Sequence, residues 1–117
     1  MGVQKKKRTQ FEYLGETFTW YFDDWYVRVY SDDKKFHVAY FTGDPWGENP
    51  HLKVLGQRFP GLETSEARPV LLCVPPFVTK EWQNSLGAFV NALIRWSLRK
   101  THKLKRYKPV TEAEDAG

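Results

Sequence analysis

Apolar and polar residues alternate along positions 11 to 41, and this pattern predicts β-strands. Because successive side chains of a strand point to opposite sides, the alternation sorts the residues onto two faces. Polar stretches at 23–24 and 31–34 divide the segment and are typical of turns, since Asp tolerates positive φ. The predicted core face collects Phe18, Trp20, Phe22, Trp25, Val27, Val29, Phe36, Val38 and Tyr40. The other face collects Thr17, Thr19, Tyr21, Tyr26, Arg28, Tyr30, Lys35 and His37.

Tight turns also predict a register for these strands. A two-residue loop at 23–24 places Phe22 opposite Trp25, and a four-residue loop at 31–34 places Tyr30 opposite Lys35. Further strands are expected around Phe11 and Tyr13, at 52–55 and at 70–74. The intervening segment 43–66 is rich in proline and glycine, which is typical of a binding loop or an oligomer arm.

A helix is predicted over 79–100, with Thr79 as its N-cap. Its apolar stripe comprises Trp82, Leu86, Phe89, Val90, Leu93 and Trp96. A stripe of this width is expected to face a core. The sequence therefore predicts an α+β fold: an antiparallel sheet of four to five strands with one long C-terminal amphipathic helix packed on one face. The same spacing places Arg95, Arg99, His102 and Arg106 on the far side of the helix, as a cationic ridge.

Charge is concentrated at the two ends of the chain. The formal net charge is +4, with a basic N-terminal arm over 1–10, a single domain over 11–108 and an acidic tail over 109–117 that is expected to be disordered. The lone Cys73 excludes a disulfide framework and suits a reducing compartment. No apolar run is long enough to span a membrane. We therefore expect a cytoplasmic protein with no membrane association.

The histidines and aspartates, which are residue types common in active sites, do not have the spacing of a catalytic or metal-binding motif. The histidines at 37, 51 and 102 do not have metal-ligand spacing, and no glycine-rich turn is placed to hold a phosphate. The paired aspartates lie where turns favour Asp. We therefore expect a non-catalytic protein without a metal or cofactor.

Basic patches next to aromatic residues favour nucleic acid as the partner. Arginine donates two parallel hydrogen bonds to phosphate, and bases of single strands stack on exposed rings. The candidate nucleic-acid-binding residues are Arg95, Arg99, His102, Lys103, Arg106, Arg28, Lys35, Tyr26 and Tyr30.

A family resemblance also favours nucleic acid as the partner. The strand Val70-Leu71-Leu72-Cys73-Val74, followed by the segment from Thr79 to Leu86 with Trp82 near its start, resembles the last strand and helix of positive-cofactor-four-type single-stranded DNA binders. The resemblance implies a curved four-stranded antiparallel sheet before an amphipathic helix, and a dimer. The chain departs from that pattern by the inserted 75–77 and by fewer lysines on its strands.

A second interpretation stays open. Tyrosine is enriched in protein interfaces, so the tyrosine face and the 43–66 loop could instead belong to a protein-interaction module or a homodimer.

Overall fold

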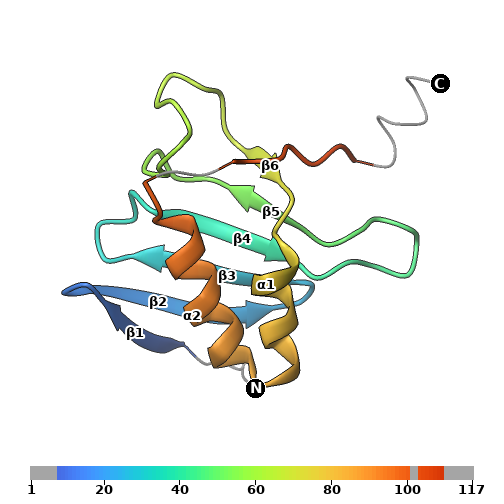
Figure 1. Ribbon diagram of the computed structural model, residues 1–117, viewed down its shortest axis with the longest axis horizontal. Coiled ribbons are helices and arrows are strands. Elements are labelled where there is room, and N and C mark those ends of the chain that lie inside the picture. Colours follow the sequence, from blue (N-terminus) through green and yellow to red (C-terminus); the bar gives the residue numbers. More distant parts are fainter. Residues whose placement is uncertain (1–7, 101–102, 110–117) are drawn as a thin grey trace, which may run out of the picture.

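The computed structural model describes residues 8–100 and 103–109 of the chain. Six strands form one antiparallel sheet in the order of the sequence, β1-β2-β3-β4-β5-β6 (Figure 1). The strands are β1 (Thr9–Tyr13), β2 (Glu16–Asp23), β3 (Tyr26–Ser31), β4 (His37–Phe41), β5 (His51–Val54) and β6 (Val70–Leu72). The helical segments α1 (Pro76–Thr79), η1 (Lys80–Gln83) and α2 (Leu86–Ser97) follow. The predicted α+β class is confirmed, with six strands in place of four to five.

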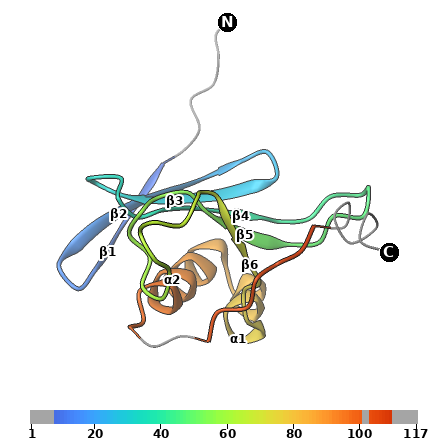
Figure 2. The ribbon, with the colours of Figure 1, turned by 90° about the horizontal axis from the view of Figure 1, so that it is seen from above.

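The helical segments all lie on one side of the sheet, as Figure 2 shows. The structure describes no helix or strand over the opposite side within residues 8–100 and 103–109. We call this opposite side the open face. The fold therefore has two layers, and only one face of the sheet is available to build a core.

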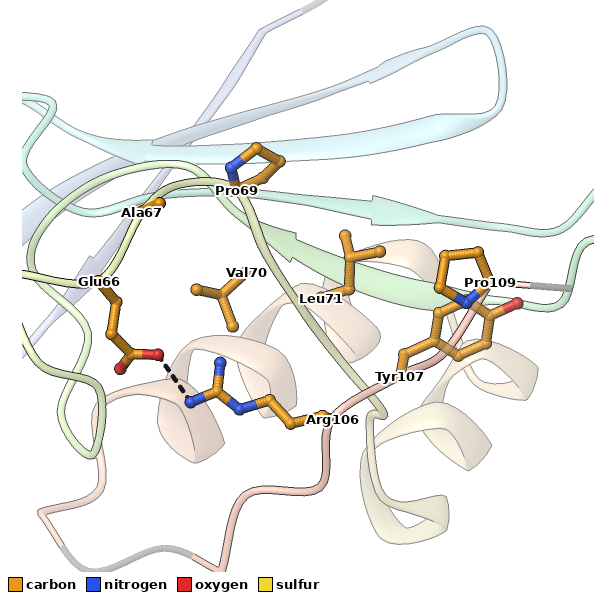
Figure 3. A pocket seen from close by; sticks show the side chains of 8 residues that line it. All are labelled: Glu66, Ala67, Pro69, Val70, Leu71, Arg106, Tyr107 and Pro109. Carbon is orange, nitrogen blue, oxygen red and sulfur yellow. Dashed lines mark hydrogen bonds and ion pairs between the residues drawn. The ribbon is translucent and has the colours of Figure 1, made fainter. Parts of the chain in front are cut away.

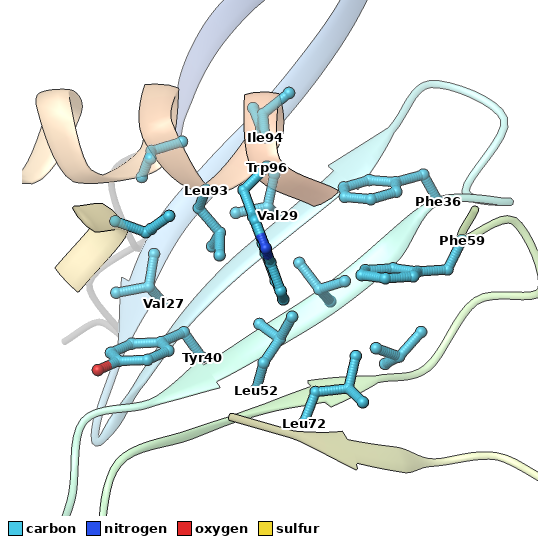
Figure 4. Packing of buried hydrophobic residues seen from close by; sticks show 14 of the residues in the cluster. Val27, Val29, Phe36, Tyr40, Leu52, Phe59, Leu72, Leu93, Ile94 and Trp96 are labelled. Carbon is cyan, nitrogen blue, oxygen red and sulfur yellow. The ribbon is translucent and has the colours of Figure 1, made fainter. Parts of the chain in front are cut away.

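The core lies between the sheet and α2 (Figure 4). Phe89, Leu93 and Ile94 of α2 are fully buried against apolar residues of β2 to β6. Aromatic rings also pack together in the core: Phe18 meets Phe36 edge-on, with centroids 5.5 Å apart. The predicted core face is correct along β2 to β4 wherever α2 covers it. Phe22 and Trp25, at the end of the β2–β3 hairpin, are still 43% and 45% exposed.

The observed register differs from the predicted one by two residues in both hairpins. Phe22 pairs with Val27 and not with Trp25, and Tyr30 pairs with His37 and not with Lys35. The first turn therefore lies at 24–25, where Asp24 has a positive φ of 54°. Because side chains alternate with a period of two, a shift of two leaves the residues within the strands on their predicted faces, while Trp25 and Lys35 lie in the turns.

The predicted helix over 79–100 is divided into three parts. Pro76 opens α1, and the chain leaves helical geometry at Ser85, whose φ of −175° is extended. The Ser85 hydroxyl accepts a hydrogen bond from the backbone N–H of Ala88 at 2.9 Å, so Ser85 is the N-cap of α2. Thr79 is not an N-cap, because its side chain accepts no hydrogen bond from the first turn that follows. Its hydroxyl instead donates to the Pro76 carbonyl.

The predicted boundary of the N-terminal arm also changes. Strand β1 begins at Thr9 and pairs with β2, so positions 9–10 belong to the sheet. The rest of the arm, at 1–7, and the tail at 110–117 lie outside the described residues.

At Gly56 the neighbouring backbone packs too closely to leave room for a side chain. Its N–H donates to the His37 carbonyl at 3.0 Å, and a Cβ there would overlap the Lys35 carbonyl oxygen and lie 2.8 Å from the His37 nitrogen. We expect Gly56→Ala to lower the free energy of unfolding by about 3 kcal/mol, since backbone atoms cannot move aside as a side chain can. Chemical denaturation measures the effect.

Gly87 provides the matched control. It lies in α2, and a Cβ there would meet only the Ser85 hydroxyl, at 3.9 Å. Gly87→Ala should raise the free energy of unfolding by at most about 1 kcal/mol, because alanine favours helix. Equal effects of the two substitutions would contradict this account of Gly56.

Candidate functional site

Cross-strand pairing arranges the side chains of the open face in three rows. The first row runs through Thr19, Tyr30 and His37; the second through Tyr21, Arg28, Ala39, Lys53 and Leu71; the third through Asp23, Tyr26, Phe41 and His51. Aromatic residues dominate the outer rows, and the middle row carries the cations. Neighbouring rows are about 7 Å apart along a strand.

Rings touch one another within both outer rows. In the first row Tyr30 meets His37 at 6.0 Å between centroids, and it also meets Tyr21 of the middle row at 6.4 Å. In the third row Phe41 lies 5.2 Å from both Tyr26 and His51. These contacts are edge-on or tilted, and aromatic pairs prefer such geometries. They leave Tyr21, Tyr26 and Tyr30 half-buried.

Two cations lie near the centre of the open face, on either side of Ala39. The Arg28 guanidinium is 5.2 Å and the Lys53 ammonium 4.9 Å from the centroid of the Tyr26 ring. Lys53 Nζ also donates to the Tyr26 hydroxyl at 2.7 Å, and Arg28 Nε lies 3.4 Å from Asp23. Cation–π contacts of this kind fix both cations, and Arg28 in addition forms an ion pair with Asp23.

Further cations border this centre. Lys34 Nζ lies 5.7 Å from the centroid of Tyr30, and the Arg8 guanidinium lies 4.8 Å from that of Tyr21. The charge of the open face is therefore carried by residues from β3, β5, the turn before β4 and the approach to β1.

The C-terminal segment extends the sheet beyond β6. Tyr107 N–H donates to the Leu71 carbonyl at 2.9 Å, and the Lys105 carbonyl accepts from Cys73 N–H at 2.8 Å. The Tyr107 ring lies parallel to that of His51, with centroids 4.1 Å apart, and its hydroxyl bonds to Glu48. Burial, above all, raises the pKa of Tyr107.

Arg106 precedes Tyr107 in the chain and points away from it. It pairs with Leu72, and its guanidinium is 2.7 Å from a carboxylate oxygen of Glu66, across the cavity that Figure 3 shows. That ion pair lowers the pKa of Glu66. Arg106 is therefore engaged by a carboxylate of the protein and does not belong to the open face.

The predicted cationic ridge does not form. Helix α2 ends at Ser97, so Arg99 and Arg106 are not on its surface, and His102 lies outside the described residues. Arg95 donates to Asn91 at 2.6 Å with its guanidinium 5.2 Å from the Tyr13 centroid. Arg99 lies over Phe77, and Lys103 is exposed on the segment after α2.

Of the candidate residues, Tyr26, Arg28 and Tyr30 are brought together on the open face. Lys35 lies in the bend before β4, where its N–H donates to Asp33. The sequence interpretation missed Lys53 and Phe41, which share the open face with Ala39. Alternation within 51–54 could have indicated Lys53, had the pairing of β5 with β4 been known.

Both described imidazoles have a lowered pKa. For His37 the main cause is burial, followed by the charges of Arg28 and Lys34. For His51 the main cause is again burial, opposed by the hydrogen bond to the Asn49 carbonyl. Both rings are therefore neutral near pH 7 and can stack as uncharged aromatics.

Residues 8–100 and 103–109 contain no group of three or more His, Cys, Asp or Glu side chains that could hold a metal ion. Within the same residues, no helix is long and apolar enough to cross a membrane.

Acidification should destabilise the fold through these two histidines. The unfolded chain takes up protons at both imidazoles below the ordinary pKa of 6.5, whereas the folded chain takes them up only at lower pH. The stability they confer is complete above about pH 6.5 and is lost as the pH falls through the folded values. Denaturation at pH 7.5 and 5.5 measures this loss, and His37→Gln should reduce it. A free energy of unfolding that is constant over this range would contradict the assignment.

Comparisons with known proteins give no match for the chain. No protein-family model matches the sequence, and neither the curated proteins nor the solved structures include a significant match. The resemblance to positive-cofactor-four-type single-stranded DNA binders, and the dimer that it implies, stay predictions, as does the absence of catalysis.

Proposed function

We propose that the protein binds single-stranded nucleic acid on the open face. The observation that carries this proposal is the pair of central cations, Arg28 and Lys53, lying between two rows of aromatic rings. Single-strand binders combine these two elements, because cations hold the phosphates while bases stack on rings.

The aromatic rows supply the stacking surfaces. Tyr26 and Tyr30 are about 13 Å apart along β3, since a strand rises about 3.3 Å per residue, and Arg28 lies between them. Stacking contributes about 1–3 kcal/mol per base. A strand crossing β3 could place one base near each tyrosine while its backbone passes Arg28.

The shape of the site favours a single strand over a duplex. Stacking on tyrosine needs bases that are not already stacked and paired with a complementary strand. Reading a duplex commonly uses a helix or a two-stranded ribbon in the major groove, and the rings of the open face lie on a broad sheet. Unpaired bases therefore suit the open face better.

Removal of the central cations provides the first test. We expect Arg28→Gln with Lys53→Gln to weaken binding of a fluorescent oligonucleotide about tenfold at low salt, because two phosphate contacts are lost. The slope of log affinity against log salt should fall by about 0.7 for each removed cation. Fluorescence anisotropy across a salt series measures both quantities.

The matched control is Arg95→Gln with Arg99→Gln. It removes the same charge from the layer of helices, where both arginines lie over rings of the protein, and should change affinity less than threefold. Equal losses in the two double variants would show that only net charge matters. Absence of binding by the wild-type protein to any single strand at low salt would refute the proposal.

Exposed tryptophans favour protein interaction as a second candidate function. Trp46, in the loop after β4, is 80% exposed and meets Trp25 with centroids 6.3 Å apart. Tryptophan is enriched at the centres of protein interfaces. The pair could therefore contact another protein or a second copy of the chain.

Trp46→Ala separates the two functions. Because Trp46 packs on Trp25 of the β2–β3 turn and both lie outside the three rows of the open face, the substitution should leave oligonucleotide affinity unchanged. Sedimentation velocity should show two chains for the wild-type protein and one for the variant if the pair forms a dimer. A mass of one chain for both would contradict dimerisation through Trp46.

A further inference from the structure

A cavity of about 320 Å³ opens beside the central cations, at the end of the third row. Tyr26, Phe41 and His51 provide its aromatic walls, and Lys53, Asp44 and Glu48 its charged groups. Its volume is at the lower end of the range of small-molecule sites, about 300–1,000 Å³. Because Tyr26 and Lys53 belong to both the cavity and the proposed binding surface, a strand held there has one base within reach of the cavity.

Asp44 is held in place by the loop that follows β4. Its Oδ1 accepts the backbone N–H of Trp46 at 3.0 Å and of Glu48 at 3.1 Å. No partner of Oδ2 occurs among residues 8–100 and 103–109. The side chain is therefore fixed by one oxygen while the other can accept a hydrogen bond from a ligand.

His51 adds a second acceptor. The residue is only 4% exposed, and its Nδ1 lies 2.8 Å from the Asn49 carbonyl oxygen. Since a carbonyl can only accept, Nδ1 carries the proton in the neutral ring and Nε2 is left as an acceptor. The described part of the chain offers Nε2 no hydrogen-bond partner, although the ring lines the cavity.

Lys53 is the donor of the cavity. One proton of its ammonium group bonds to the Tyr26 hydroxyl, and an ammonium group has three. The cavity thus combines acceptors at Asp44 and His51 with one cationic donor, and its walls are aromatic.

We propose that the cavity binds a guanine base of the single strand. Asp44 Oδ2 and His51 Nε2 accept from the adjacent N–H groups at N1 and N2, and Lys53 donates to O6. This inference rests on the proposed function, since the strand delivers the base.

The other bases match this set of groups less well. Guanine has two adjacent N–H donors next to an acceptor on its pairing edge, whereas adenine and cytosine have one exocyclic amino group and thymine one ring N–H. A phosphate in the cavity would be repelled by the carboxylates of Asp44 and Glu48. The cavity therefore selects a base over a phosphate.

Three fluorescent strands test this inference: oligo-dT, the same strand with one central guanine, and the same strand with hypoxanthine in place of the guanine. Hypoxanthine lacks the N2 amino group and keeps N1–H and O6. We expect the guanine strand to bind the wild-type protein about tenfold more tightly than oligo-dT, the low end of discrimination by a paired base edge. The hypoxanthine strand should lie between them.

Asp44→Asn should abolish the preference and retain binding of oligo-dT within about threefold. The amide oxygen can still accept from Trp46 and Glu48, so the loop is kept, while the amide nitrogen replaces the free acceptor. Asp32→Asn, in the exposed turn after β3, is the control with the same change in charge and should keep the preference.

Each outcome decides between the two proposals. Equal affinity of the wild-type protein for all three strands, or a guanine preference that persists in Asp44→Asn, would overturn the cavity assignment and leave the proposed function standing. If the wild-type protein binds none of the strands at low salt, the proposed function fails and the cavity assignment fails with it.

Discussion

Packing of α2 against one face of the sheet is the contact on which the rest of the structure depends. Phe89, Leu93 and Ile94 are fully buried there, and burial of such side chains contributes about 1.5–3 kcal/mol each. The described residues supply one layer of helices, which covers one face. The other face of the sheet must then be stabilised by its own side chains.

On the open face, rings and cations take the role that a second layer would have. Phe41 is only 6% exposed because Tyr26 and His51 lie against it. The charged groups of Lys53 and Arg28 lie over the Tyr26 ring, and both side chains stay partly exposed. The contacts that protect this side of the sheet therefore also produce a surface of rings and positive charge.

The sequence predicts features that depend on neighbouring residues better than features that depend on contacts between distant segments. Alternation assigns Val27 and Tyr26 to opposite faces without knowledge of the partner strand, so the faces are predicted correctly even though the register is wrong by two residues. Turn positions depend on one or two residues, and Asp24 and Trp25 form the turn in place of Asp23 and Asp24. Local patterns thus give the faces, but a turn displaced by one residue shifts the strand register by two.

Local sequence patterns do not predict where the helices begin and end. They also do not predict which distant segments join the open face. Apolar spacing continues through Asn84 and Ser85, and only the extended backbone at Ser85 shows that a new helix starts there. The ridge expected from Arg95 to Arg106 assumed one continuous helix. Lys53 and Tyr107 reach the open face through pairings with β4 and β6, which depend on loops whose paths no periodicity describes.

The cations and the carboxylates of the open face differ in what they attract. Arg28 and Lys53 attract any polyanion regardless of sequence, and such contacts alone give affinity without selectivity. Asp44 and Glu48 oppose that attraction within one cavity and would weaken a site that bound only phosphate. Their cost to affinity is compensated only by a ligand that donates hydrogen bonds, which a nucleobase does and a phosphate does not. An acidic cavity within a basic surface is therefore better suited to selecting a base than to increasing affinity.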